Sequence, residues 1–295
     1  MTRTLEASPL AASIVAELGE GPQWDSERGR LSWVDIVAGR IHVGAADGSL
    51  LRTFELDRPV GAALPAAGGG FLVADARGFT KLDEDGTAFE LLPVLADDPR
   101  VRFNDGKCDA LGRAWAGTMA YDQTPGLGVL YRLDPGPVAT PVLSGLTVSN
   151  GLGWSPDGRT MWFADSAMPQ LAAFAYDLDD GLMGRRTAVI ELQQDRAVPD
   201  GLCVDDDGCV WVALWGAGAV HRYTPDGRLD TIVSVAAEQV TSCAFGGGGL
   251  ATLFITTARS GLAPEEAERQ PLAGSVFAVE PGVTGPAAVP WRPVG

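Results

Sequence analysis

Asparagine is almost missing from this chain, whose 295 residues include only Asn104 and Asn150. Lysine is nearly as rare, since Lys81 and Lys107 are the only two among 22 basic residues. The formal net charge is −16. Such an acidic chain has no electropositive surface that would attract a nucleic acid or an anionic membrane. We therefore expect neither as a partner.

Histidine and cysteine are also scarce. The two histidines, His42 and His221, lie in segments typical of strands, and no G-x-S-x-G motif is present, so the sequence does not favour a serine triad. The four cysteines follow no C-x-x-C pattern, and three of them lie in apolar runs. We expect reduced, buried thiols rather than disulfides at Cys108, Cys203, Cys209 and Cys243.

Long apolar runs are absent as well. No run reaches the ~18 residues that a membrane-spanning helix needs. Residues 1–21 lack the basic start and the leucine-rich core of a signal peptide. We therefore expect a soluble, cytoplasmic protein.

Glycine and proline, by contrast, are abundant. Their 38 and 20 residues are typical of many short strands joined by tight turns. A pattern of strand, glycine-containing turn and second strand recurs along the chain, and the second strand begins 10 to 12 residues after the first. The six units begin at residues 20, 60, 104, 150, 200 and 241.

A period of 40–50 residues made of paired strands predicts an all-β fold, the six-bladed β-propeller with a central channel. We expect one such domain over residues 1–295. The apolar runs 12–18 and 274–280 should share one blade and close the ring, which removes free sheet edges. A helical fold is not favoured, because no segment sustains an apolar period of 3.6 residues.

The start of the first strand is the same position in every unit. Its six occupants are Glu20, Val60, Asn104, Asn150, Asp200 and Thr241. Because the first strand of each blade lines the channel, these side chains should face one another around its mouth. Asn-Gly and Asp-Gly pairs are also ordinary turn formers, which is the alternative interpretation. Four oxygen-bearing side chains at equivalent positions favour a shared site.

Two carboxylates held close in a partly dehydrated channel repel each other, and burying them unpaired is costly. A divalent cation removes that cost. Carboxylate and amide oxygens suit a hard ion such as Ca²⁺, Mg²⁺ or Mn²⁺. The sequence therefore predicts one divalent metal ion in the channel. The segment "DDDG", residues 205–208, lacks the remaining spacing of a calcium loop and is interpreted as an exposed hairpin.

Several motifs together resemble the SMP-30/gluconolactonase/regucalcin family of sugar lactonases. They are "GEGPQWD", "RFNDGKCD", "AGTM", "SNGLGWSPDG", "PDGLCVDDDG", "TSCAFGG" and "TTARSG…ERQPLAGSVFAVEPGVTG". The likeness extends from about residue 14 to 290. It implies a six-bladed propeller, one catalytic divalent ion, which can be Ca, Mg, Mn, Zn or Fe, and hydrolysis of sugar lactones to aldonic acids.

Carried over by position, the resemblance also implies roles for single residues. The metal ligands fall on Glu20, Asn150 and Asp200. Substrate contacts fall on Arg102 and Asn104, with Asn104 near the metal. A substrate-contacting carboxylate aligns with Asp122, where the family member compared most directly has Glu. Of the eight tryptophans, one or two near the channel mouth could pack on a sugar face.

The hypothesis is metal-assisted lactone hydrolysis with Asp200 as general base and Arg102 holding substrate oxygens. Two alternatives use the same ring of oxygens: a phosphotriesterase-like hydrolase, and a calcium-binding or protein-interaction propeller without catalysis. The sequence contains no pattern that selects one sugar lactone or one oligomeric state.

Overall fold

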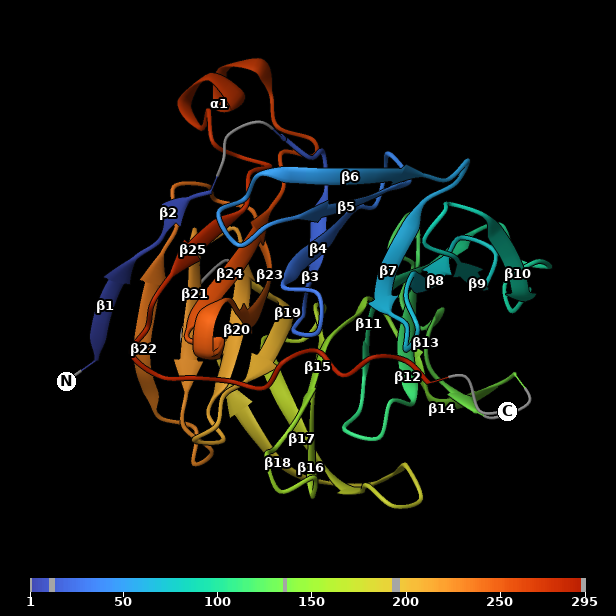
Figure 1. Cartoon of the computed structure of the whole chain (residues 1–295). Coiled ribbons are helices and arrows are strands. Elements are labelled where there is room, and N and C mark those ends of the chain that lie inside the picture. Colours follow the sequence, from blue (N-terminus) through green and yellow to red (C-terminus); the bar gives the residue numbers. More distant parts are fainter. Residues whose placement is uncertain (1, 11–13, 135–136, 193–196, 293–295) are drawn as a thin grey trace.

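The computed structural model describes residues 2–10, 14–134, 137–192 and 197–292, and nearly all of their regular structure is strand. The strands form six successive sheets (Figure 1). The first blade contains β3 (Gly19–Asp25), β4 (Arg30–Asp35), β5 (Arg40–Gly44) and β6 (Leu50–Glu55). The second contains β7 (Val60–Pro65), β8 (Phe71–Asp75), β9 (Phe79–Leu82) and β10 (Ala88–Leu92).

The third and fourth blades repeat this order. The third contains β11 (Val101–Cys108), β12 (Ala114–Ala120), β13 (Gly128–Asp134) and β14 (Val138–Leu146). The fourth contains β15 (Ser149–Trp154), β16 (Thr160–Asp165), β17 (Gln170–Asp177) and β18 (Leu182–Glu191).

The last two blades each include a strand from the N-terminus. The fifth contains β19 (Val198–Val204), β20 (Val210–Trp215), β21 (Ala219–Tyr223), β22 (Leu229–Ser234) and β1 (Arg3–Glu6). The sixth contains β23 (Val240–Gly246), β24 (Thr252–Thr257), β25 (Phe277–Val279) and β2 (Ser8–Pro9). A 3₁₀ turn, η1 (Gly248–Leu250), joins β23 to β24, and one short helix, α1 (Pro264–Arg269), precedes β25.

The inner strands form a closed ring around the propeller axis. Each contacts the inner strand of the next blade, from β3 through β7, β11, β15 and β19 to β23, and β23 contacts β3 again. Inner strands are almost entirely buried, whereas outer strands such as β6 and β18 are mostly exposed. The predicted six-bladed propeller is confirmed. In the described part of the chain, no helix has the length and apolar character needed to cross a membrane.

Strands from both ends of the chain close the ring, as predicted, but the N-terminal segment differs from the prediction. Strand β2 pairs antiparallel with β25, so residues 8 and 9, not 12–18, complete the sixth blade. Residues 12 and 13 lie outside the described residues, and 14–17 form no strand. The prediction was wrong because an apolar segment can be buried without pairing in a sheet. Ile14 packs on the cluster that contains Trp24, Trp33 and Phe254.

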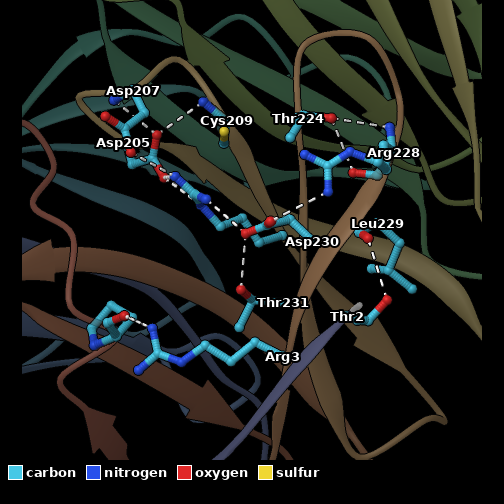
Figure 2. A network of polar contacts seen from close by, with 12 residues as sticks. Thr2, Arg3, Asp205, Asp207, Cys209, Thr224, Arg228, Leu229, Asp230 and Thr231 are labelled. Carbon is cyan, nitrogen blue, oxygen red and sulfur yellow. Dashed lines mark hydrogen bonds and ion pairs between the residues drawn. The ribbon is translucent and has the colours of Figure 1, made fainter.

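Strand β1 was not predicted, and it extends the fifth blade by pairing parallel to β22. Figure 2 shows the residues that fix it. Arg3 donates a hydrogen bond to the carbonyl oxygen of Pro281, at 2.7 Å, and the Thr2 hydroxyl donates one to the carbonyl oxygen of Leu229, at 3.4 Å. Thr2 and Arg3 thereby join the fifth blade to the segment that follows β25.

The hairpin of residues 205–208 is exposed only in part, which corrects the prediction. Asp205 is completely buried, while Asp206 and Asp207 are exposed. The Asp205 carboxylate, labelled in Figure 2, accepts a hydrogen bond from Arg222 Nε, at 2.7 Å. It also accepts one from Trp211 Nε1, at 2.9 Å. A buried carboxylate is tolerated when it is paired and hydrogen-bonded in this way, so Asp205 stabilises the fifth blade.

All four cysteines are free and buried, as predicted. The sulfur atoms of Cys203 and Cys243 lie 3.7 Å apart, in the inner strands of neighbouring blades. They belong to the apolar cluster between the fifth and sixth blades.

The six positions at the starts of the inner strands, residues 20, 60, 104, 150, 200 and 241, are called the ring positions below. Residues 281–292 cross the opposite end of the propeller (Figure 1). Thr284 hydrogen-bonds to Asp206 beyond the end of β19, and Trp291 N donates to the carbonyl oxygen of Pro65 at the end of β7, at 2.7 Å. Residues 286–289 line the cavity at this end of the channel. The opposite end of the channel holds the ring.

Candidate metal centre

The ring positions lie where the inner strands depart from regular pairing. All six inner strands show a register shift here, for example between Phe103 and Asp105 in β11 and between Ser149 and Leu152 in β15. A β-bulge of this kind turns a side chain away from the sheet. The Asn150–Gly151 pair therefore stands inside a strand, and the alternative interpretation as a turn is wrong.

The glycines that follow Asn150 and Asp200 have a packing role. A Cβ atom on Gly151 would lie 2.5 Å from the carbonyl oxygen of Asp200, and one on Gly201 would lie 2.1 Å from the hydroxyl of Ser242. Inner strands approach most closely near the axis, where only glycine leaves room for the neighbouring backbone. The Asn-Gly and Asp-Gly pairs thus combine a polar side chain with a close contact between blades.

The structure brings the four polar ring residues together in one cavity of about 390 Å³. They are Glu20, Asn104, Asn150 and Asp200, each at most 6% exposed. The remaining two positions do not line it. Val60 is fully buried in the core, and the Thr241 hydroxyl donates to the carbonyl oxygen of Gly19, at 2.6 Å, across the junction that closes the ring.

Asn150 occupies the centre of this polar group. Its Nδ2 atom donates hydrogen bonds to the Asp200 carboxylate and, at 3.0 Å, to the hydroxyl of Ser166. Its Oδ1 atom is buried and has no hydrogen-bond partner. A buried amide oxygen without a partner is costly, so its position requires a ligand such as a cation or a water.

The carboxyl groups of Glu20 and Asp200 lie close enough to perturb each other's ionisation. Burial, followed by the charges of Asp200 and Asp105, raises the pKa of Glu20 well above its ordinary value. Burial and the charge of Asp105 raise the pKa of Asp200 to about 8. Asp105 is a third buried carboxylate that sequence reasoning missed, although it follows Asn104 directly. The site has an excess of negative charge that a cation would relieve.

These residues fit a divalent metal. Within the described ranges, no group of three or more His, Cys, Asp and Glu side chains could hold a metal ion, so an amide oxygen must complete any set here. The unpartnered Asn150 oxygen beside two carboxylates supplies such a set. All donors are oxygen, which selects a hard ion with waters in the remaining positions.

Arg102 lines the cavity with a positively charged side chain, and the residue is 8% exposed. Its Nη1 atom donates to Asn104 Oδ1, at 2.8 Å, and to the carbonyl oxygen of Phe103, at 3.0 Å. Asn104 in turn donates to the carbonyl oxygen of Ser149, at 3.1 Å. These contacts hold the guanidinium in place with further N–H donors available for a substrate. Because Asn104 Oδ1 accepts this bond, Asn104 orients the Arg102 guanidinium.

Asp122 lies beside the cavity but does not line it. The residue is exposed, and its carboxylate accepts hydrogen bonds from the backbone N–H and hydroxyl of Thr124, at 3.0 and 2.7 Å. The next residue, Gln123, lines the cavity instead and has a positive φ of 56°. No sequence pattern could identify Gln123, because its direction depends on this unusual backbone conformation.

The cavity has further members that sequence reasoning did not assign. Ser166 fixes the Asn150 amide, and Trp215, at the end of β20, lines the wall. Trp215 is a tryptophan whose side chain lines this cavity, and its role toward a ligand stays a prediction. The other wall residues are Thr147 and six apolar residues, Leu18, Ile36, Met119, Val148, Ala167 and Val198.

Known proteins share this architecture. Regucalcin from Danio rerio is 34% identical over 266 residues, which cover 89% of this chain and 90% of that protein. The Bacillus subtilis (strain 168) protein named "Putative sugar lactone lactonase YvrE" is 32% identical over 284 residues, covering 96% and 97%. The crystal structure of a calcium-binding protein, regucalcin, from Agrobacterium tumefaciens superposes with a TM-score of 0.93 at 27% identity, covering 99% of this chain and 100% of that one.

The match to a protein family includes every ring position. Residues 18–259 match the family described as SMP-30/Gluconolactonase/LRE-like region, a range that extends from just before Glu20 to just after β24. The chain therefore belongs to the SMP-30/gluconolactonase/LRE-like family.

Proposed function

We propose that this protein is a divalent-metal-dependent lactonase that hydrolyses a sugar lactone to the aldonic acid. The observation that carries the proposal is the buried, unpartnered amide oxygen of Asn150 beside the Glu20 and Asp200 carboxylates, in a cavity that also holds Arg102. The name of the Bacillus subtilis relative supports the reaction class, and the calcium-binding regucalcin supports a metal.

The proposed metal ligands are Glu20, Asn150 and Asp200. When bound, a divalent cation would act as a Lewis acid for the lactone carbonyl and for the charge that develops on its oxygen. Arg102 would donate hydrogen bonds to the substrate carbonyl or hydroxyl oxygens, because Asn104 and Phe103 already fix its position. Trp215 and Gln123 would contact the sugar from the wall of the cavity.

Asp200 is the proposed general base. The oxygen of a water molecule attacks the carbonyl carbon while the water gives one proton to the Asp200 carboxylate. The bond between the carbonyl carbon and the ring oxygen then breaks, and the ring oxygen leaves as a hydroxyl after taking that proton. The water thus supplies both the acid oxygen and the new hydroxyl proton, and Asp200 returns to its starting state.

The decisive experiment compares Asp200→Asn with wild type after metal removal and restoration of one divalent cation at a time. Hydrolysis of glucono-, xylono-, arabinono- and galactonolactone is followed by acid release, and metal binding by calorimetry. We expect a loss of at least about a hundredfold in kcat for Asp200→Asn at saturating metal, as for removal of a general base. Asp226→Asn, an equal change at an exposed turn residue, should leave activity unchanged.

Three outcomes would count against the proposal. A loss of less than about tenfold in the metal-saturated Asp200→Asn variant would remove Asp200 from the role of base. Metal-supported turnover of phosphotriesters without turnover of any lactone would indicate the phosphotriesterase-like alternative. Metal binding without turnover of either substrate class would indicate a binding propeller.

A further inference from the structure

A second cavity, of about 340 Å³, lies at the far end of the first two blades. It is bordered by Asp25 at the end of β3, Arg30 at the start of β4, Pro65 at the end of β7 and Phe71 at the start of β8. Glu20 and Val60 stand at the opposite ends of β3 and β7. The cavity is therefore separated from the metal position by the length of the inner strands.

The floor of this cavity is aromatic and apolar. Phe54 and Phe71 meet edge to face, with ring centroids 6.0 Å apart and an interplanar angle of 75°. Each is 8% exposed, and Val43 beside them is 7% exposed. The Arg52 guanidinium lies over the Phe54 ring, 4.2 Å from its centroid. A floor of this kind favours a flat apolar body over a polyhydroxylated one.

The rim of the cavity carries three arginines, two of which are held in place. Arg52 donates hydrogen bonds to the carbonyl oxygens of Glu84 and Asp85, and so bridges the two blades. Arg28 pairs with Asp25, at 3.0 Å, and with Glu84, at 3.3 Å. Both guanidiniums keep further N–H donors, since each has five.

Arg30 differs from these two, because its side chain has no hydrogen bond or ion pair with any residue that the structure describes. The chain has 38 acidic residues for 22 basic ones, so acidic partners are plentiful. The three arginines of the lining exceed its two carboxylates, Asp25 and Glu84, in a protein of net charge −16. Glu27, 3.8 Å from Arg28, is a third acidic neighbour, so it is the unpaired guanidinium of Arg30 that suits an anion.

We propose that this cavity binds a small aromatic carboxylate, with the ring on Phe54 and Phe71 and the carboxylate against Arg30 and Arg52. Its volume lies at the lower end of the range for small-molecule sites, about 300–1,000 Å³. Guanidiniums that border an aromatic floor provide charge-assisted hydrogen bonds for the carboxylate and a contact surface for the ring of such a ligand. This site is independent of the proposed lactonase reaction.

The test uses 2-naphthoate as the anionic probe and 2-naphthamide as its neutral counterpart, each titrated into the full-length protein by calorimetry. We expect saturable binding of one naphthoate and at least about tenfold weaker binding of the amide, because charge-assisted bonds to the arginines are lost. Absence of saturable naphthoate binding at millimolar concentration, or equal affinities for the two probes, would overturn the proposal.

Variants then locate the site. Arg30→Gln should weaken naphthoate binding at least about tenfold. Arg185→Gln is the matched control, since Arg185 is exposed on the outer strand β18 of the fourth blade, and it should bind within twofold of wild type. Asp200→Asn should bind naphthoate unchanged. Equal losses in both arginine variants, or a loss in Asp200→Asn, would place the probe elsewhere and overturn the assignment.

Discussion

Asn150 donates a hydrogen bond from its side-chain nitrogen to the carboxylate of Asp200, one blade further along the ring. The amide oxygen of the same side chain is buried without a hydrogen-bond partner. The hydroxyl of Ser166 accepts a second hydrogen bond from the same nitrogen, so the orientation of the amide is fixed from two sides. Two neighbouring blades thereby contribute polar side chains to one cavity.

Metal affinity should depend on both Asn150 and the group that orients it. Asn150→Ala removes a proposed ligand and should abolish measurable binding of Mn²⁺ or Ca²⁺ by calorimetry. Ser166→Ala keeps all proposed ligands but removes the hydroxyl that accepts a hydrogen bond from the Asn150 amide. It should weaken metal binding about tenfold, as expected for a residue that orients a ligand without binding the metal. Equal affinity of wild type and Asn150→Ala would show that the ion binds elsewhere.

Metal binding should release protons. In the metal-free protein, burial and repulsion raise the pKa of Asp200 to about 8 and that of Glu20 well above its ordinary value, so the pair holds at least one proton at pH 7. A cation must displace it. We expect affinity to increase by roughly tenfold per pH unit between pH 6 and 8 and to level off above that range. Calorimetry in buffers of different ionisation enthalpy measures the released protons directly, and a binding enthalpy independent of buffer would contradict this.

Substitutions can distinguish the contribution of Gln123 to substrate binding from that of Asp122. Gln123→Gly tolerates the positive φ and removes only the side chain that lines the cavity, so we expect KM for the preferred lactone to increase about tenfold with kcat nearly unchanged. Asp122→Asn keeps an oxygen acceptor for Thr124 and should change KM less than about threefold. A larger effect of Asp122→Asn would instead support the substrate contact that the family resemblance implies for Asp122.

His221 should make the protein less stable in acid. It is fully buried in β21, and burial lowers its pKa from the ordinary value of 6.5 to about 4. The neutral form is favoured in the folded state, so this stability is present above pH 6.5 and is lost as pH falls toward 4. When the pH is lowered from 7.5 to 5, the free energy of unfolding measured with urea should decrease by about 2 kcal/mol less in His221→Gln than in wild type. Parallel pH profiles for the two proteins would remove His221 as the cause.

The repeat of glycine turns and apolar strands was sufficient to predict the blades. A hairpin pairs strands that are adjacent in sequence, and each unit contains the residue pattern of its own strands and turn. The same alignment selected Glu20, Asn104, Asn150 and Asp200, since equivalent positions of a circular repeat must converge on the axis. The N-terminal closure was placed a few residues too late, because an apolar run such as 12–18 can pack on a blade without pairing with it.

By itself, the sequence determined the number of blades and which residues stand at the start of each inner strand, because both follow from spacing along the chain. Only the tertiary structure decided where those side chains point. The bulges, the hydrogen bond between Asn150 and Asp200, and the turn that directs Gln123 rather than Asp122 into the cavity all depend on contacts between segments far apart in the chain or on local backbone angles. The arginine-lined cavity could not be predicted from the sequence for the same reason. Its lining combines Arg28, Arg30 and Arg52 of the first blade with Phe71 of the second, which meet only when the two blades pack together.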